Sequence, residues 1–228
     1  MTQPAHSKDK FGPDLKVIVI GNTSTGKTSF LNRYINGSYA ENYYPTISFN
    51  FNHKIIQNNN TLFRVQFWDL AGQDRNPELT NIFCQNSQGI IVLCEANNEN
   101  SRKDTLKWKD SLFEKGRINP NQAMIILVEN KSDLLPKGNE KADELERFAY
   151  ENQFDGCFRT SAKLGEGIQD AMNYLLKGII NNKLTYEEQV GYSYRSSKKS
   201  NVISLNNSRV NESNDEDSYN DYRNELCC

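Results

Sequence analysis

Short apolar runs alternate along the chain with stretches that have an amphipathic, helical pattern. The runs at residues 15–21, 89–96 and 123–130 have the length and β-branched content of buried strands, and a helical pattern follows each of them. This alternation is typical of βαβ units, in which a mostly parallel sheet carries helices on both faces. The pattern therefore predicts an α/β domain.

One pair of strands departs from this alternation. SFNFNHKII at residues 48–56 and TLFRVQFWD at residues 61–69 read as two strands, and the Asn-rich stretch QNNN between them reads as a tight turn. With a last strand in GCFRTSA at residues 156–162, we predict a six-stranded, mostly parallel sheet that has one antiparallel edge hairpin.

The pattern also predicts where the domain begins and ends. A final amphipathic helix should close it near Asn182, so we expect a flexible N-terminus at residues 1–13, one domain at residues 14–182 and a tail at residues 183–228. In the tail Ser, Asn, Asp, Glu and Tyr dominate, and such a segment buries too little apolar surface to offset its ordering entropy.

Composition excludes several classes of protein. The 228 residues are 36% hydrophobic, enough for one core, and the net charge of -2 gives no basic field that would attract nucleic acid. No apolar run approaches the roughly 20 residues of a membrane helix, and the N-terminus lacks the apolar region of a signal peptide. We expect a cytosolic protein in which Cys84, Cys94 and Cys157 are buried thiols.

A phosphate-binding motif follows the first strand. Residues 21–28 match G-x-x-x-x-G-K-T between a strand and a helix, where backbone N–H groups point at phosphate oxygens. Lys27 would add a charge near the β and γ phosphates, and the Thr28 hydroxyl would ligate Mg²⁺. The alternative is an ordinary strand–turn–helix. The predicted nucleotide contacts here are Gly21, Asn22, Thr23, Ser24, Thr25, Gly26, Lys27, Thr28 and Ser29.

The sequence WDLAGQ places three further candidates after the third strand. Asp69 would hold Mg²⁺ through water, and Gly72, without a side chain, would let its N–H approach a γ-phosphate. Gln73 has both a donor and an acceptor with which to orient an attacking water, so it is the candidate catalytic residue. An ordinary turn also explains D-x-x-G taken alone.

Two motifs at later strand ends indicate the base. In NKSD, the Asp133 carboxylate can accept the two hydrogen bonds that a guanine edge donates and adenine does not. Asn130 and Lys131 would brace the loop and the ring. A solvated polar turn explains NKSD in isolation, but TSAK at residues 160–163 follows the last strand and strengthens the guanine interpretation.

Together GNTSTGKT, YPTI, WDLAGQ, NKSD and TSAK resemble, in order and spacing, the Ras superfamily of small GTPases, over about residues 14–182. The resemblance implies the P-loop NTPase G-domain fold and a GTP/GDP switch with Mg²⁺. Thr46 would bind Mg²⁺ and report the γ-phosphate, and Tyr39 would pack against guanine. Further contacts implied by the resemblance are Tyr43, Ser161, Ala162 and Lys163.

Within the superfamily the chain looks most like a Rab, because TISFNF is similar to a Rab stretch. Phe51, Trp68 and Phe83 stand where Rabs carry an effector-binding aromatic triad, and we place Ile47 on the same surface. These aromatics could equally be core residues of the hairpin, and both can be true. TLKWKDSL is similar to Rabs of lysosome-related organelles, although helix packing explains Trp108 equally well.

The C-terminal ELCC resembles the double-cysteine end on which Rabs receive two geranylgeranyl groups. One lipid anchors only marginally without a basic patch, and residues 211–226 hold six acidic residues against one arginine. We therefore expect lipids on both Cys227 and Cys228; two incidental thiols are the alternative. The resemblance implies cycling between the cytosol and the cytoplasmic face of an intracellular membrane. It also implies effectors, an exchange factor, a GTPase-activating protein, a prenylation escort and a GDP-dissociation inhibitor.

Three places depart from the usual Rab pattern. Ser24 restricts a backbone position that glycine tolerates, and Asn76 and Pro77 alter the second switch. Ser48 and Glu129 are milder changes. We expect binding to survive and unaided hydrolysis to be slow, about 10⁻⁴ to 10⁻³ per second. One alternative is a binding module that no longer hydrolyses GTP. A second is an ATPase, which conflicts with the guanine motif.

Overall fold

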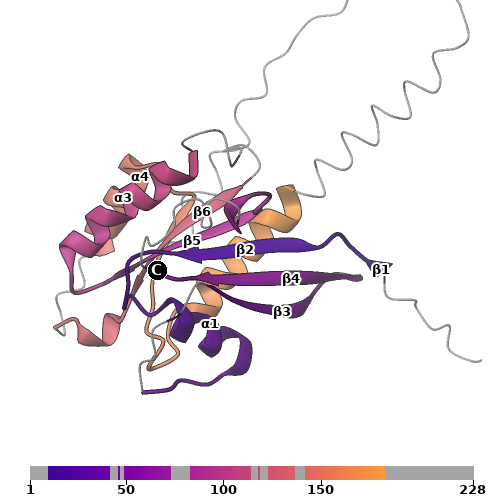
Figure 1. The fold of residues 1–228 in the computed structure, drawn as a ribbon, viewed down its shortest axis with the longest axis horizontal. Coiled ribbons are helices and arrows are strands. Elements are labelled where there is room, and N and C mark those ends of the chain that lie inside the picture. The colour runs from indigo at the N-terminus through magenta and orange to yellow at the C-terminus, as the bar shows by residue number, and fades with distance from the viewer. Residues whose placement is uncertain are drawn as a thin grey trace, which may run out of the picture.

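The computed structural model describes residues 10–41, 46, 49–72, 83–113, 118, 123–136 and 142–182. In this part of the chain one sheet has the strand order β1-β4-β2-β5-β6-β7, and β3 also pairs with β4. Every pairing is parallel except β3 with β4 (Figure 1). The strands are β1 Lys10–Phe11, β2 Leu15–Ile20, β3 Phe49–Asn58, β4 Thr61–Leu70, β5 Gly89–Glu95, β6 Met124–Asn130 and β7 Gly156–Arg159.

The six predicted strands and the antiparallel hairpin are confirmed, and β1 is an addition. β1 and β2 both pair in parallel with β4, Lys10 opposite Thr61 and Leu15 opposite Val65, so β1 continues the line of β2 along its neighbour. This short strand lies within residues 1–13, which we expected to precede the domain. Two residues are too few to show a strand pattern in the sequence.

The hairpin turn is tighter than the stretch QNNN suggested. Asn58 pairs with Thr61, so only Asn59 and Asn60 form the turn, and the strand alternation continues to the end of β3. Asn59 has φ 51°, a left-handed conformation that asparagine tolerates better than most residues.

Helices cover both faces of the sheet, as the alternating pattern predicted. They are α1 Lys27–Asn36, α3 Glu99–Phe113, α4 Ala142–Glu151 and a helix at residues 168–182, with a 3-10 turn, η2, at Ser132–Leu134. On one face, α1 and the helix at residues 168–182 pack on Val17 and Val19 of β2. On the other, α3 and α4 pack on Ile18 and Ile20, because successive strand residues point to opposite faces (Figure 1).

Three cysteines are buried thiols outside any disulfide, and their burial was predicted: Cys84, Cys94 and Cys157. Among the described helices, none is both long and apolar enough to span a membrane. Because β2, β4, β5, β6 and β7 run in parallel, their carboxyl ends meet at one edge of the sheet. The predicted nucleotide motifs follow these ends, so the fold brings them together.

Candidate functional site

The loop between β2 and α1 closes around a lysine. Lys27 begins α1, and its Nζ donates to the carbonyl oxygens of Gly21 at 2.9 Å and of Asn22 at 2.8 Å. Gly26 precedes it with φ 92°, and a Cβ there would lie 2.4 Å from the Asn130 side-chain nitrogen. Glycine therefore lets Asn130 reach the loop, where its amide donates to the Thr25 carbonyl at 3.0 Å.

The start of α1 suits an anion. Among the described residues no side chain caps the helix N-terminus, and its first turn carries no acidic residue. Lys27 is buried, and this burial lowers its pKa to about 8, while the nearby Asp69 charge opposes the shift. A phosphate at this point would meet backbone N–H groups and compensate the buried positive charge. Ser29 lies in the same first turn.

Oxygen atoms of three separate segments gather beside the loop. The Thr28 hydroxyl donates to Asp69 Oδ2 at 2.6 Å, and the Thr28 and Thr46 hydroxyl oxygens lie 2.8 Å apart. Asp69 Oδ1 is buried and has no hydrogen-bond partner among the described residues. Burial raises the pKa of Asp69, which the bond from Thr28 partly opposes. Hard oxygen ligands around an unsatisfied carboxylate atom fit Mg²⁺, which prefers oxygen.

The segment after β4 returns to the phosphate loop. A Cβ on Gly72 would lie 2.4 Å from the Thr23 backbone nitrogen and 2.5 Å from the Asn22 carbonyl carbon. Backbone atoms cannot give way as a flexible side chain does, so this close approach requires glycine. The structure thus places the start of the predicted second switch directly against the phosphate loop.

The two predicted base motifs form one connected unit. The Asn130 side-chain oxygen accepts from the Thr160 hydroxyl at 3.2 Å and from the Ala162 N–H at 3.1 Å. Ser161 Oγ donates to Asp133 at 2.5 Å and accepts from the Leu164 N–H at 3.0 Å. These bonds hold the Asp133 carboxylate in a defined place, as recognition of a planar base edge requires.

Sequence reasoning missed Arg33, which braces the base loop from α1. Its Nε donates to the Ala162 carbonyl at 2.9 Å and its Nη2 to the Lys163 carbonyl at 2.8 Å. The same guanidinium lies over the ring of Tyr39, 5.9 Å from the centroid. An arginine in an amphipathic helix pattern reads as a solvent-facing residue, so the sequence held no signal of this role.

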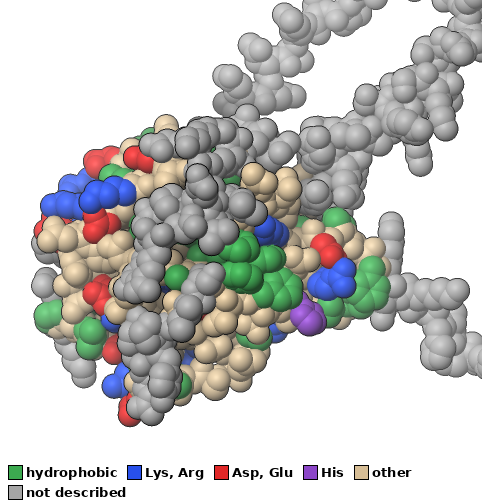
Figure 2. Space-filling model, viewed as in Figure 1, with side chains coloured by type: hydrophobic (Ala, Val, Ile, Leu, Met, Phe, Trp, Pro, Cys, Tyr) green, Lys and Arg blue, Asp and Glu red, His purple; other side chains and the backbone are tan. Residues whose placement is uncertain are grey.

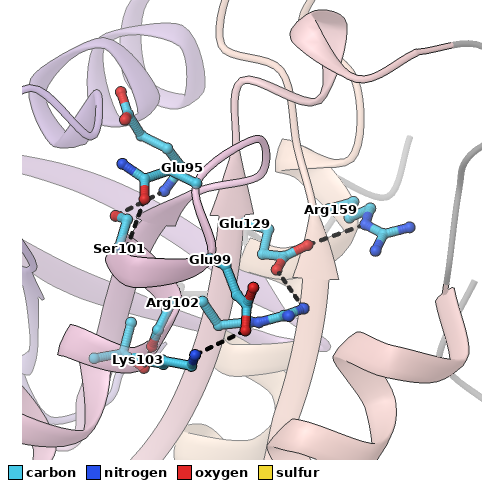
Figure 3. A network of polar contacts seen from close by, with 9 residues as sticks. Glu95, Glu99, Ser101, Arg102, Lys103, Glu129 and Arg159 are labelled. Atoms are coloured by element: carbon cyan, nitrogen blue, oxygen red, sulfur yellow. Dashed lines mark hydrogen bonds and ion pairs between the residues drawn. The ribbon is translucent and has the colours of Figure 1, made fainter.

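Glu129 has a larger role than the mild departure noted in the sequence. Its carboxylate is buried at the end of β6 and bridges Arg102 of α3, at 3.3 Å, and Arg159 of β7, at 3.1 Å (Figure 3). Beside it Glu95, at the end of β5, pairs with Lys131. The sequence contained a signal of this role, because Glu129 is a charged residue within the apolar run AMIILVEN. A carboxylate that is buried in this way needs partners.

The predicted aromatic triad lies together and includes a fourth ring. Trp68 contacts Phe51 and Phe83, with ring centroids 5.1 Å and 5.6 Å away, and Phe49 lies 4.4 Å from Phe83. Phe49 and Phe51 are more than a third exposed. Figure 2 shows hydrophobic side chains gathered in a patch on one face of the molecule. Phe49 shares a strand face with Phe51, two residues away, which was a usable signal.

Several predicted residues fall outside the part of the chain that the structure describes. They are the candidate catalytic Gln73, the implied contacts Tyr43 and Ile47, the altered positions Ser48, Asn76 and Pro77, and the two terminal cysteines, Cys227 and Cys228. Residues 1–9 and the tail at residues 183–228 also lie outside it.

Comparisons with known proteins identify the family of the chain. The sequence model of the Ras family matches residues 16–181. The chain is 32% identical to Ras-related protein Rab-32C of Dictyostelium discoideum, over 78% of this chain and 79% of that protein. It is 32% identical to human Ras-related protein Rab-32, over 76% and 78% of the two chains, and 31% identical to human Rab-7L1, over 73% and 83%. The chain therefore belongs to the Ras family of small GTPases and, within it, to the Rab proteins.

Proposed function

We propose that this Rab protein is a GTP/GDP switch that regulates membrane trafficking, and that the residues gathered at the sheet edge bind and hydrolyse the nucleotide. The observation that carries the proposal is the joining of the phosphate loop, the magnesium ligands and the base motifs into one site. Membership of the Ras family supports GTPase activity. The assignment of individual residues is the proposal.

The phosphate loop binds the anionic end of the nucleotide. Backbone N–H groups of residues 22–28 and the start of α1 donate to the phosphate oxygens, and Lys27 supplies a positive charge near the β and γ phosphates. The Gly21 and Asn22 carbonyls already hold Lys27 Nζ, so little side-chain entropy is lost when the phosphates bind.

Thr28 and Thr46 provide hydroxyl oxygens for Mg²⁺, and Asp69 holds the ion through water. When bound, Mg²⁺ neutralises the charge that develops on the phosphate oxygens. Asp133 accepts hydrogen bonds from guanine, and Asn130, Ser161 and the Arg33-braced loop keep its carboxylate in place. Adenine offers no matching donor pair, so the site selects GTP and GDP.

The terminal phosphate decides which of two states the protein adopts. Thr46 and the Gly72 N–H contact the γ-phosphate, and Gln73 orients the water that attacks it. Hydrolysis removes these contacts and releases the segments at residues 41–48 and 71–80. In the GTP state Ile47 and the four neighbouring aromatic residues present a surface to effectors. These aromatic residues are Phe49, Phe51, Trp68 and Phe83. An exchange factor and a GTPase-activating protein set the rates of the cycle.

Binding and phosphate release test this proposal. Protein freed of carried-over nucleotide should bind GTP and GDP in magnesium buffer and should not bind ATP at the same concentration. Unaided single turnover should be slow, about 10⁻⁴ to 10⁻³ per second, and Gln73→Leu should slow it further. Equal, negligible release by wild type and Gln73→Leu would instead mean a binding module, which the Rab relatives do not favour.

Membrane attachment depends on the two terminal cysteines. The acidic segment before them, residues 211–226, offers no electrostatic attraction to anionic lipid. Two prenyl chains are therefore needed for stable anchoring. A prenylation escort would present the chain for modification, and a GDP-dissociation inhibitor would return it to the cytosol. Mass spectrometry of membrane-bound protein should find two lipids, on Cys227 and Cys228. A variant with serine at both positions should remain in the soluble fraction, whereas unchanged membrane binding would contradict the assignment.

A further inference from the structure

The side chain of Asn22, in the phosphate loop, is held at both ends by α3. Trp108 Nε1 donates to Asn22 Oδ1 at 2.8 Å, and Asn22 Nδ2 donates to Asp104 Oδ2 at 2.9 Å. Asp104 and Trp108 are one turn apart, so they project from the same face of α3. Among the described residues, the groups that hydrogen-bond to this amide therefore come from one helix.

The backbone of Asn22 stands at the centre of the proposed phosphate site. Its carbonyl oxygen accepts from Lys27 Nζ at 2.8 Å and from the Thr25 hydroxyl at 3.0 Å. The same carbonyl lies within 2.6 Å of the point that a Gly72 Cβ would occupy. A movement of the Asn22 backbone would thus displace Lys27 and alter the contact with the second switch together.

We infer that Trp108 and Asp104 are positioning residues for the γ-phosphate end of the site: by fixing the Asn22 amide, α3 sets the placement of Lys27 and of the loop against Gly72. The inference rests on the proposed function. Without these bonds the Asn22 side chain no longer restrains its own backbone, and the corner between Lys27 and Gly72 loses its fixed geometry. GTP, which extends into this corner, should suffer more than GDP, which ends before it.

Trp108→Phe tests the inference, because it keeps an aromatic ring in the helix packing and removes the indole N–H, together with part of the ring volume. Single-turnover GTP hydrolysis should slow about three- to tenfold, the range that one neutral hydrogen bond spans. The ratio of GTP to GDP dissociation rates should rise by a similar factor. Lys107→Gln is the matched control: Lys107 is exposed and contacts the other Asp104 oxygen, Oδ1, at 2.6 Å, so its loss leaves the bond to Asn22 intact.

An exchange of groups separates positioning from packing. Asn22→Asp alone sets two carboxylates against each other and should slow hydrolysis at least as much as Trp108→Phe does. Adding Asp104→Asn restores a donor–acceptor pair, since the new amide can donate to the new carboxylate. The double variant should recover hydrolysis to within about threefold of wild type. Asp104→Ala, at a half-exposed position, gives a further measurement if Trp108→Phe does not fold.

The outcomes are distinct. If the Trp108 and Asp104 variants lower the melting temperature but leave both the hydrolysis rate and the GTP-to-GDP ratio unchanged, α3 only packs against the loop and the inference is overturned. A double variant no better than Asn22→Asp alone would overturn it too. If wild type binds neither GTP nor GDP, the proposed function fails and the inference fails with it.

Discussion

Ser24 has a backbone conformation that its side chain disfavours. Its φ of 65° lies in the left-handed region, where Cβ crowds the following carbonyl, at a cost of about 1–2 kcal/mol. The neighbouring Thr25 is buried, and its hydroxyl bonds to the Asn22 carbonyl, so the loop as a whole holds Ser24 in this conformation. Strain of this kind is common at ligand-binding loops.

Ser24→Gly should therefore stabilise the protein. Relief of the strain, less the extra backbone entropy of glycine in the unfolded chain, predicts a gain of about 0.5–1 kcal/mol in the free energy of unfolding. Urea denaturation of both proteins measures it. Ser29→Gly is the control: in the first turn of α1 the change from serine to glycine should destabilise by roughly 0.5 kcal/mol. A loss of stability in Ser24→Gly would contradict the strain argument.

We predict that the Tyr34 hydroxyl lowers the free energy of unfolding at alkaline pH. The ring is buried against Phe67, and burial raises the pKa of its hydroxyl to about 12, above the ordinary value near 10. The folded protein therefore keeps this proton where the unfolded chain has lost it. The contribution is complete below about pH 10 and declines between pH 10 and 12, by roughly 1 kcal/mol per pH unit.

A comparison of two tyrosine variants isolates this effect. Tyr34→Phe should remove that part of the alkaline decline, so its free energy of unfolding should change less than that of wild type between pH 10 and 12. Tyr150→Phe, at a position that is 76% exposed, should keep the wild-type slope. Parallel curves for wild type and Tyr34→Phe would show that the hydroxyl titrates as in water.

At the scale of elements, Glu129 connects α3, β6 and β7. It lies next to the loops that carry the NKSD and TSAK motifs. Its carboxylate accepts from Arg102 and Arg159, whose side chains retain 17% and 21% exposure (Figure 3). Arg159 directly precedes Thr160 and the base loop. A displaced β7 would therefore move the residues that hold Asp133, so the ion pairs also support the proposed guanine pocket.

Glu129→Gln should destabilise the protein by about 2–3 kcal/mol. Removal of a buried partner leaves unpaired charges, and the residual exposure of the two arginines reduces the cost below that of a fully buried pair. Glu99→Gln is the matched control, because Glu99 pairs with Lys103 of the same helix at the surface; it should cost less than about 0.5 kcal/mol. Equal losses in chemical denaturation would contradict a special role for Glu129.

At the scale of the whole molecule, one sheet carries two cores. Clusters on its two faces share the central strands β2, β5 and β6, so neither face can unfold while the other stays packed. The proposed nucleotide site lies at the edge where these strands end. Ligand binding there should stabilise the domain as one cooperative unit.

Thermal unfolding with added nucleotide measures this linkage. With excess Mg²⁺, each tenfold rise in GDP above its dissociation constant should add about 1.4 kcal/mol to the free energy of unfolding, and ATP should add nothing. Lys27→Met, which keeps the length of the side chain without its charge, should largely lose the response to GDP. An equal response to ATP would contradict base selection by Asp133.

The sequence alone determined the strand order along the chain, and it predicted the phosphate loop, the candidate magnesium ligands and the candidate base motifs. These features are local: a strand shows in a run of apolar residues, and a phosphate loop in glycines, a lysine and a threonine at fixed spacing. The parallel topology then places every motif at the same edge of the sheet, so their proximity also followed from the pattern.

Only the tertiary structure decided which polar side chains join these motifs. Trp108 and Asn22 are 86 residues apart, and Arg33 and the Ala162 carbonyl are 129 residues apart. Trp108 and Arg33 read by themselves as packing and solvent-facing positions, because periodicity reports the face of an element and not its partner. Such contacts depend on how α3 and α1 lie against loops from distant parts of the chain, and only the packed sheet brings these together.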